Sequence, residues 1–478
     1  MNQELLQYVQ KQVAVTNDKL TTLTHDRGGK IYPRRYLFAK LQEYAKDFIH
    51  NNSENRWIIV PGLRGVGKTT VLAQTMMDIK NDNKDIDLLF VSMDEVKELF
   101  NVGLKDVLNA YEQILGKSYE KLKKPVFIFF DEVQTDSDWA GVIKAMIYEK
   151  TKNVFIVCSG SSAIGLQMSA DSARRAIVEK LYPMSFTEYQ RIKNSILSNE
   201  ELGEKIKQAI YFSSCAKEAF EKMKKLEGQV NNYWSKVDRM EIREYLIIGT
   251  LPFALTKKEL AQVFSSISLL VDKVVSKDIG ALERFDTKTL STIKRLLLIL
   301  AESEVVSLNK LEQLLYINRL TIAEILDVLE KAELLIKVPA HGANVAVVKK
   351  PAKYLFMSPA IRMAFFSIAG LESTFLSRQG RLLEDIVAAH YHREFLSKGV
   401  GSLSYDSREN GADFIFRIAN KIQIAAEIGI GKKNAKQVAK TMKSTKCDYG
   451  IVISQERLSL DRMDENILMI PLDYFLLM

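Results

Sequence analysis

Short apolar runs alternate with amphipathic helical patterns along the first part of the chain. Runs with the length of buried strands lie at residues 56–60, 88–94, 125–130 and 153–158. Apolar residues at helical spacing precede or separate these runs, at residues 37–50, 70–79 and 107–115. Continuous apolar strands are typical of parallel sheets that are covered on both faces. We therefore predict an α/β fold, a doubly wound parallel sheet, for residues 1–190, which include an N-terminal helical extension.

The pattern becomes mainly helical after residue 190. Lysine-rich helices follow, and we assign residues 191–284 to a helical lid or linker. Within residues 285–372 the pattern predicts three helices and then two strands, at 289–301, 307–315, 320–331, 334–338 and 343–348. This element order is typical of a winged helix-turn-helix. In the last predicted domain, residues 373–478, a helical stripe precedes predicted strands at 413–418, 422–428 and 448–453.

A glycine-rich segment joins the first predicted strand to the helix that follows it. It matches the phosphate-binding pattern GxxxxGK[ST] with Gly62, Leu63, Arg64, Gly65, Val66, Gly67, Lys68 and Thr69, followed by Thr70. The glycines allow backbone N–H groups to surround a phosphate chain, where a Cβ atom would obstruct them. Lys68 is predicted to reach the outer phosphates, and Thr69 to ligate Mg²⁺. The residues of this segment do not distinguish ATP from GTP as the bound nucleotide.

Polar side chains follow two other predicted strands of the same domain. Asp131 and Glu132 end the apolar run at 125–130 and so lie at the edge where parallel sheets bind ligands. We expect Asp131 to hold Mg²⁺ and Glu132 to orient or deprotonate the attacking water. Ser159 and Ser161 follow the run at 153–158, and one of them is our candidate for sensing the γ-phosphate. The alternative is that these serines only cap the next helix.

A second group of carboxylates lies in the last predicted domain. Glu384 is at the edge of the helical stripe, Asp413 opens one strand, and Glu427 lies on the adjoining strand. Carboxylates placed in this way can meet over a divalent ion. Nucleases use such an arrangement to activate water and to stabilise the departing phosphate.

Composition and charge add little that is specific. The 478 residues are 47% hydrophobic and 26% charged, which is ordinary for a multidomain globular protein. No apolar run reaches the about 20 residues of a membrane span, and residues 1–20 are polar, so we expect a cytoplasmic protein without a membrane partner. The net charge of +8 permits DNA contact, but a solvated lysine-rich surface explains it equally well. Candidate contacts to a DNA backbone are Lys337, Lys349, Lys350 and Lys353, because the third helix of the predicted winged domain presents Glu324 and Asp327.

Taken together, the chain resembles the archaeal and bacterial AAA+-like ATPases of the STAND type, whose carboxyl half carries a winged helix and a restriction-endonuclease-like domain. Besides the nucleotide motifs, the resemblance rests on residues 158–163, 173–176, 181–189 and 353–359. It implies ATP as the nucleotide, with Mg²⁺. It also implies that Arg175 acts on the γ-phosphate, in the same chain or in a neighbouring subunit of an oligomer; the alternative is a surface charge in a loop.

The chain departs from this family pattern at two places. Arg174 stands where such families have glycine, and Gly429 stands where the endonuclease-like pattern Glu-x-Lys has lysine. Lys432 is a candidate to reach the carboxylate site from another backbone position, and otherwise the domain is a binding module without catalysis.

Three functions are therefore open. The first is an ATP-driven switch that acts on a macromolecular partner, with DNA as the leading candidate. The second is an ATP-gated, metal-dependent DNA nuclease, and the third is an ATP-dependent scaffold for protein partners.

Overall fold

The computed structural model describes residues 3–14, 16–83, 85–161, 173–279, 287–342, 350–368, 370, 375–419, 422–431 and 435–478. The chain forms two compact units, Met1–Tyr182 and Pro183–Met478. The finer boundaries at 190, 284 and 372 stay predictions. None of the described helices has both the length and the apolar composition that crossing a membrane requires.

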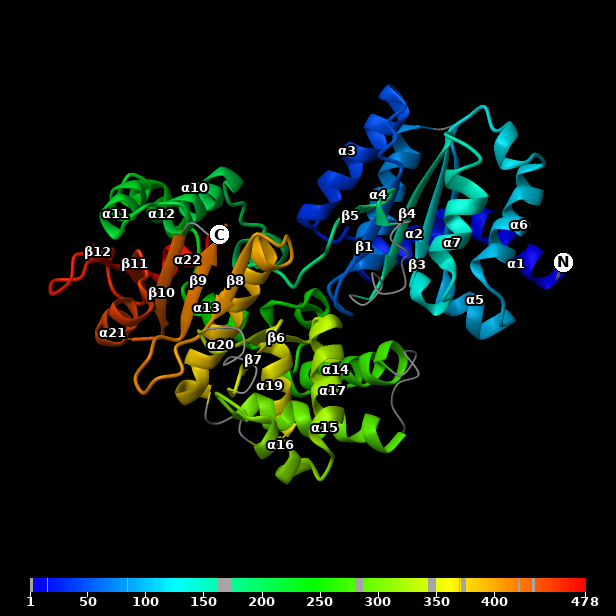
Figure 1. Ribbon diagram of the computed structural model, residues 1–478. Coiled ribbons are helices and arrows are strands. Elements are labelled where there is room, and N and C mark those ends of the chain that lie inside the picture. The colour runs from blue at the N-terminus through cyan, green and yellow to red at the C-terminus, as the bar shows by residue number, and fades with distance from the viewer. Residues whose placement is uncertain are drawn as a thin grey trace. The chain divides into compact units, whose positions relative to one another are not determined.

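A five-stranded sheet forms the centre of the first unit (Figure 1). Its strands are β1 (Trp57–Pro61), β2 (Asp87–Ser92), β3 (Val126–Asp131), β4 (Val154–Gly160) and β5 (Ile177–Val178). Their order is β2-β3-β4-β1-β5, and every neighbouring pair is parallel. The four predicted strands and the parallel sheet are confirmed. The sequence reading missed β5, because two residues are too short to give a periodic signal.

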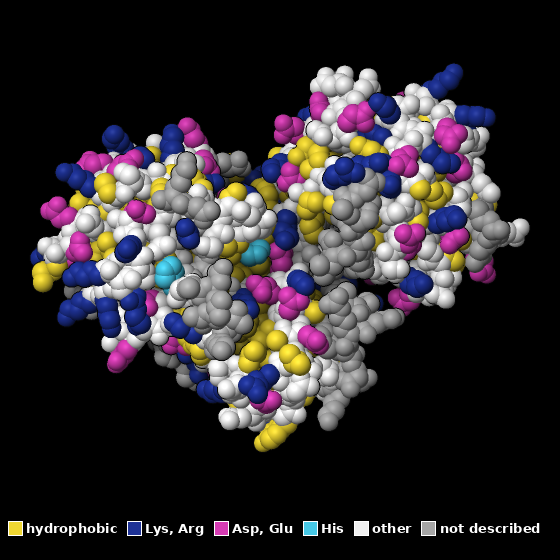
Figure 2. All heavy atoms as spheres, viewed as in Figure 1, with side chains coloured by type: hydrophobic (Ala, Val, Ile, Leu, Met, Phe, Trp, Pro, Cys, Tyr) yellow, Lys and Arg dark blue, Asp and Glu magenta, His cyan; other side chains and the backbone are white. Residues whose placement is uncertain are grey.

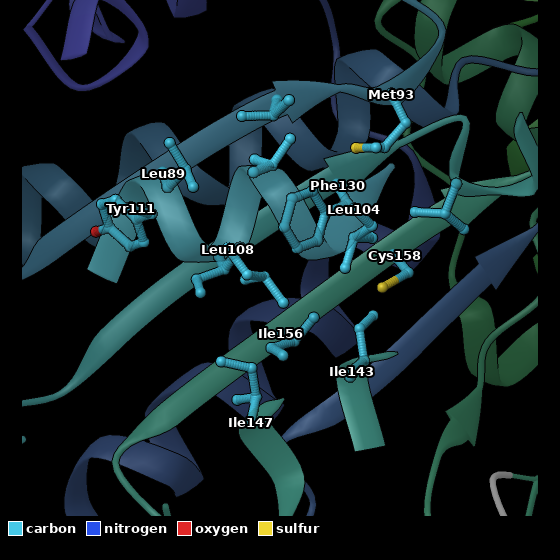
Figure 3. Close-up of a cluster of buried hydrophobic side chains, with 14 of the residues drawn as sticks. Leu89, Met93, Leu104, Leu108, Tyr111, Phe130, Ile143, Ile147, Ile156 and Cys158 are labelled. Carbon is cyan, nitrogen blue, oxygen red and sulfur yellow. The ribbon is translucent and has the colours of Figure 1, made fainter. Parts of the chain in front are cut away.

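Helices cover both faces of this sheet. They are α1 (Gln3–Ala14), α2 (Thr16–Thr24), α3 (Tyr36–Asn51), α4 (Lys68–Asp82), α5 (Met93–Phe100), α6 (Leu104–Leu115) and α7 (Trp139–Ile143). On one face, buried residues of α6 and α7 pack on alternate residues of β2, β3 and β4, as Figure 3 shows for Leu108, Ile143 and Ile156. On the other face, the Phe48 ring of α3 lies 5.4 Å from the rings of both Phe127 and Phe155. The sheet is thus buried on both sides, which explains its continuous apolar runs.

The second unit begins with a set of helices. They are α9 (Phe186–Asn194), α10 (Glu200–Tyr211), α11 (Ala216–Lys224), α12 (Glu227–Trp234), α13 (Met240–Glu244) and α14 (Leu260–Lys273). Two hydrogen bonds join this segment to the carboxyl-terminal part of the chain: the indole N–H of Trp234 donates to the carbonyl of Asp473 at 2.9 Å, and the hydroxyl of Tyr449 donates to the carbonyl of Ile210. Part of the segment 191–284 therefore packs against the carboxyl-terminal part of the chain, and its role as a helical lid or linker stays a prediction.

Three helices and an antiparallel pair of strands follow. They are α15 (Thr287–Glu302), α16 (Leu308–Leu315), α17 (Arg319–Lys331), β6 (Leu335–Val338) and β7 (Lys353–Phe356). The side chains of Ser307 and Asn318 cap α16 and α17. The predicted strand at 343–348 lies outside the described residues, and the partner of β6 is β7 instead. Helix α19 (Pro359–Ile368) continues from this pair.

The carboxyl-terminal part is a mixed sheet with helices. It contains α20 (Phe375–Tyr391), β8 (Gly401–Ser404), β9 (Phe414–Ile418), β10 (Ile422–Ile428), α21 (Lys436–Thr445), β11 (Tyr449–Ser454), β12 (Ser459–Leu460), β13 (Ile467–Pro471) and α22 (Leu472–Phe475). The sheet order is β12-β13-β11-β10-β9-β8. Strands β10, β11 and β13 are parallel to one another, and β8, β9 and β12 are antiparallel to their neighbours. The three predicted strands of this part are confirmed.

Candidate phosphate-binding site

The glycine-rich turn between β1 and α4 has a backbone that side chains would disturb. Gly65 and Gly67 have φ values of +82° and +95°, which residues with a Cβ atom rarely adopt. At Gly62, a Cβ atom would lie 2.3 Å from the carbonyl oxygen of Leu181. The glycines of the pattern therefore serve both the tight curvature of the turn and its close approach to the chain beyond β5.

The polar residues of the motif meet at the carboxyl edge of the sheet. The ammonium group of Lys68 is buried and donates to the carbonyls of Gly62 and Leu63, at 2.9 and 3.3 Å. The hydroxyl of Thr69 donates to one carboxylate oxygen of Asp131 at 2.5 Å. The hydroxyl of Ser159 donates to the other oxygen of Asp131. Thr69 and Ser159 are thus in contact with Asp131, and the functional roles predicted for these side chains stay predictions.

The two serine candidates differ in their surroundings. Ser159 supports Asp131, which gives its hydroxyl a role in fixing a carboxylate. Ser161 is buried just beyond the end of β4. That one of these two serines senses the γ-phosphate stays a prediction.

Asp131 is a buried acid beside another acid. Burial and the neighbouring Glu132 raise its pKa, although the hydrogen bonds from Ser159 and Thr69 and the charge of Lys68 act in the opposite direction. A bound cation would relieve this cost, because it stabilises the charged form of the carboxylate. The hydroxyl of Thr69 and the carboxylate of Asp131, already in contact, form an oxygen donor pair of the kind that Mg²⁺ prefers. The residues present therefore fit a magnesium–nucleotide complex.

Glu132 occupies an unusual backbone conformation and two partners hold its carboxylate. Its φ is +54°, in the left-handed region that residues other than glycine seldom adopt. A guanidinium nitrogen of Arg64 lies 2.9 Å from Oε2 of Glu132, and the amide of Gln134 donates to the same oxygen at 2.5 Å. Sequence reasoning missed the pairing with Arg64, because the variable positions of the motif carry no signal about their partners.

A second arginine, Arg35, supports the glycine-rich turn, and the sequence analysis did not predict this contact. Arg35 is buried, and its two terminal nitrogens donate to the carbonyl of Val66 at 2.5 Å and to the carbonyl of Tyr182 at 2.9 Å. An arginine before a helix is common, so nothing in the sequence pointed to this contact. Arg35 holds the turn in place from outside the motif.

Arg175 does not lie beside the phosphate-binding turn. It precedes β5, whose parallel pairing with β1 places Arg175 at the amino-terminal edge of the sheet. There its guanidinium lies 2.6 Å from the carboxylate of Glu149 and 5.8 Å from the ring centre of Tyr148. The turn lies at the opposite edge, so the prediction that Arg175 acts within its own chain is corrected. Its action in a neighbouring subunit stays a prediction.

The predicted metal site in the carboxyl-terminal part is not formed as expected. Within the described ranges, no group of three or more His, Cys, Asp or Glu side chains is arranged to hold a metal ion. Glu384 and Asp413 do lie close together, but around the ammonium group of Lys353. Glu427 is buried on β10, and Lys432 lies outside the described residues.

The lysines near the hairpin that were proposed to contact DNA differ in their exposure to solvent. Lys337 and Lys350 are exposed, as a contact with phosphate requires. Lys353 is buried with 3% of its surface exposed, so its assignment to a DNA backbone is corrected. Lys349 lies outside the described residues.

Comparison with known protein families identifies the first unit. A family model described as an AAA domain matches residues 54–190, and a second model, described as a domain of unknown function, matches residues 239–372. The first match spans β1, the phosphate-binding turn, β3 and β4. These residues therefore form an AAA-type P-loop ATPase domain.

Two uncharacterized proteins are similar over most of the chain. One, MJ1637 of Methanocaldococcus jannaschii, is 35% identical over 447 residues, which cover 93% of this chain and 89% of the relative. The other, from Haemophilus influenzae, is 23% identical over 409 residues, covering 82% and 86%.

Among solved structures, the Aeropyrum pernix ORC1 protein in complex with DNA is similar, at 13% identity and a TM-score of 0.32. That match covers 73% of this chain and 95% of the other chain, but its TM-score is too low to support a functional argument.

Proposed function

The chain belongs to the same family as the uncharacterized protein MJ1637 and carries an AAA-type P-loop domain, and on this premise we propose that it is a Mg²⁺-dependent ATPase. We propose further that ATP binding and hydrolysis switch its action on a macromolecular partner, with DNA as the favoured partner. The observation that carries the ATPase proposal is the hydrogen bond between Thr69 and Asp131 beside the glycine-rich turn. It joins the two predicted magnesium ligands, which are 62 residues apart in sequence.

Each residue of the site then has a defined task. Thr69 and Asp131 would hold Mg²⁺, which when bound neutralises charge on the phosphates. Lys68 exchanges the carbonyls of Gly62 and Leu63 for the outer phosphates. Glu132 orients the attacking water and accepts its proton, which requires its carboxylate to leave Arg64.

Steady-state hydrolysis of Mg·ATP tests this proposal directly. Lys68→Ala is the blank, and Lys124→Ala is the matched control, because Lys124 is an exposed lysine of the same unit that pairs only at the surface with Asp85. We expect turnover in the wild-type protein and in Lys124→Ala, and none above background in Lys68→Ala. Turnover that survives Lys68→Ala would overturn the proposal.

A basic surface in the second unit supports DNA as the partner. Figure 2 shows Lys and Arg side chains gathered over α21, where Lys436, Lys440, Lys443 and Lys446 are all exposed. Lys436, Lys440 and Lys443 recur at intervals of three or four residues and so lie on one face of α21, and Lys446 follows directly after its end. Such a face suits the phosphate backbone, which is recognised by charge and without regard to base sequence. We also propose that α15–α17 with β6 and β7 form a winged helix, whose exposed Lys337 and Lys350 add to the basic surface.

Hydrolysis in the presence of single- and double-stranded DNA tests this part. We expect DNA to stimulate turnover, and the combined change of Lys440 and Lys443 to Glu to remove the stimulation while basal turnover stays unchanged. The salt dependence of DNA binding should also become shallower in that variant. Turnover that is indifferent to DNA would reject DNA as the partner and favour the protein scaffold.

A further inference from the structure

Lys353 lies between the carboxylates that the sequence suggested as metal ligands. Its ammonium group is 3.3 Å from a carboxylate oxygen of Glu384 on α20 and 3.2 Å from a carboxylate oxygen of Asp413 at the start of β9. A third carboxylate, that of Glu304, is at 4.0 Å. The three acids thus surround one positive charge that comes from β7.

The remaining surroundings of this ammonium group are closed. Only 3% of Lys353 is exposed, and the ring centres of Tyr405 and Phe414 lie 5.8 and 5.6 Å from its nitrogen. The second oxygen of Asp413 accepts a hydrogen bond from the backbone N–H of Ile428 at 2.9 Å. Asp413 therefore has both oxygens engaged, one by the ammonium group and one by β10.

Asp385, the residue after Glu384, also links α20 to the preceding part of the chain. Asp385 is fully buried and receives both Nε and a terminal nitrogen of Arg362 on α19 at 2.7 Å, together with the backbone N–H of Phe356 on β7 at 2.8 Å. Adjacent acids of α20 are thus bonded to β7 and α19. This places Lys353 in a joint between the strand pair and the carboxyl-terminal sheet.

We propose that the ammonium group of Lys353 takes the place of a divalent cation between Glu384 and Asp413, so that this cluster is a structural joint and not a metal-dependent nuclease centre. A metal ion could bind there only by displacing a buried, paired ammonium group, and removing one partner from a buried ion pair is strongly unfavourable. The proposal explains why β7 begins with lysine in the segment 353–359. It does not depend on the ATPase activity proposed above.

Binding of Mn²⁺ to the full-length, nucleotide-free protein tests this assignment. We compare wild type with Asp413→Asn, which retains the shape of the side chain and an oxygen that can accept from Lys353. We expect the two binding isotherms to coincide. A manganese ion that the wild type binds and Asp413→Asn loses would overturn the proposal.

Removing the lysine gives the converse test. We expect Lys353→Ala, if folded, to gain a Mn²⁺ site about tenfold or more tighter than any that the wild type has in this part, and to lose it again when Asp413→Asn is added. Lys350→Ala is the matched control, since this exposed lysine lies three residues earlier and contacts only Ser407 among the contacts described. A folded Lys353→Ala protein that gains no site would contradict the exchange of lysine for metal. If Lys353→Ala does not fold, the wild-type and Asp413→Asn isotherms still decide.

Nuclease assays provide the third test of the proposal. We expect no nicking of supercoiled plasmid by the wild-type protein with Mn²⁺, with or without ATP. Nicking that disappears in both Lys353→Ala and Asp413→Asn would show that Lys353 is a catalytic lysine, and would overturn the proposal.

Discussion

A guanidinium nitrogen of Arg64 lies 2.9 Å from the carboxylate of Glu132, so the phosphate-binding turn itself holds the carboxylate assigned to water activation. Only 16% and 13% of these two side chains are exposed. The pair therefore competes with the use of Glu132 as a base.

We predict that Arg64→Ala hydrolyses ATP faster than the wild type. The expected increase in kcat is about fivefold, which corresponds to about 1 kcal/mol for a pair of this kind. Arg64→Lys, which retains the charge but loses the planar fork, should fall between the two. A slower Arg64→Ala enzyme would mean that Arg64 assists the reaction.

Glu132→Gln should separate binding from chemistry. The amide keeps the size of the side chain but cannot accept the proton of water, so we expect kcat to fall by about 100-fold or more while ATP still binds. Equilibrium binding of a fluorescent ATP analogue, measured beside turnover, distinguishes the two effects. Loss of binding in this variant would instead place Glu132 in the nucleotide pocket.

Arg175→Ala should have little effect in isolated chains. Its partner Glu149 lies at the edge of the sheet opposite to the turn, so we expect turnover within about twofold of the wild type, as for a surface ion pair. The measurement is specific activity over a range of protein concentrations. A deficit that grows with concentration would reveal the predicted action in a neighbouring subunit.

The buried pair of Arg362 and Asp385 should be costly to break. Arg362→Met leaves the Asp385 charge without its main partner, and we expect the free energy of unfolding to fall by about 3–5 kcal/mol. Combining it with Asp385→Asn should recover part of this loss, because the charge is then gone and the N–H of Phe356 keeps an acceptor. Denaturant unfolding of both single variants and the double variant measures the coupling. If the losses of unfolding free energy in the two single variants simply add in the double variant, the two residues are not coupled and the prediction is wrong.

Acid should destabilise the second unit through His390. Burial, and then the charge of Arg393, lower the pKa of His390 from 6.5 to about 3. Arg393 donates to Nδ1 at 3.1 Å, a contact that the protonated ring cannot accept. The unfolded chain takes up this proton below about pH 6.5 and the folded chain does not, so stability falls as the pH drops, by about 1.4 kcal/mol per unit from this group.

His390→Phe provides the comparison for that prediction. It keeps a planar ring beside Tyr211 and Phe475 and removes the titration. The difference in stability between wild type and His390→Phe should therefore depend on pH between about 4 and 6.5. A difference that is constant with pH would exclude His390 as the cause.

The sequence predicted the parts of the molecule that periodicity and local pattern determine. The parallel strands and the convergence of Lys68, Thr69 and Asp131 follow from apolar runs and from the rule that ligands bind at carboxyl edges. The bonds of Arg35 and Arg64 could not be predicted, because they join positions that no motif links.

Errors arose where a partner distant in sequence decided the outcome. Lys353 was expected to contact a DNA backbone because it lies near the predicted hairpin, yet it is buried beside Glu384 and Asp413. A helical pattern shows that one face is apolar and does not show which sheet will cover it, so the packing of part of the segment 191–284 on the carboxyl-terminal part could not be predicted. In both places tertiary packing decided what local sequence did not.

The contact of Gly62 with Leu181, and the bond from Arg35 to Tyr182, have a consequence for biosynthesis. The motif that binds phosphate is translated early, but its backbone rests on residues that the ribosome adds well over a hundred positions later. A nascent chain that ends before residue 181 therefore carries the complete motif without the support that shapes it. We therefore expect nucleotide binding to require the chain up to Tyr182, so that chains ending before residue 181 bind ATP more weakly than the complete first unit.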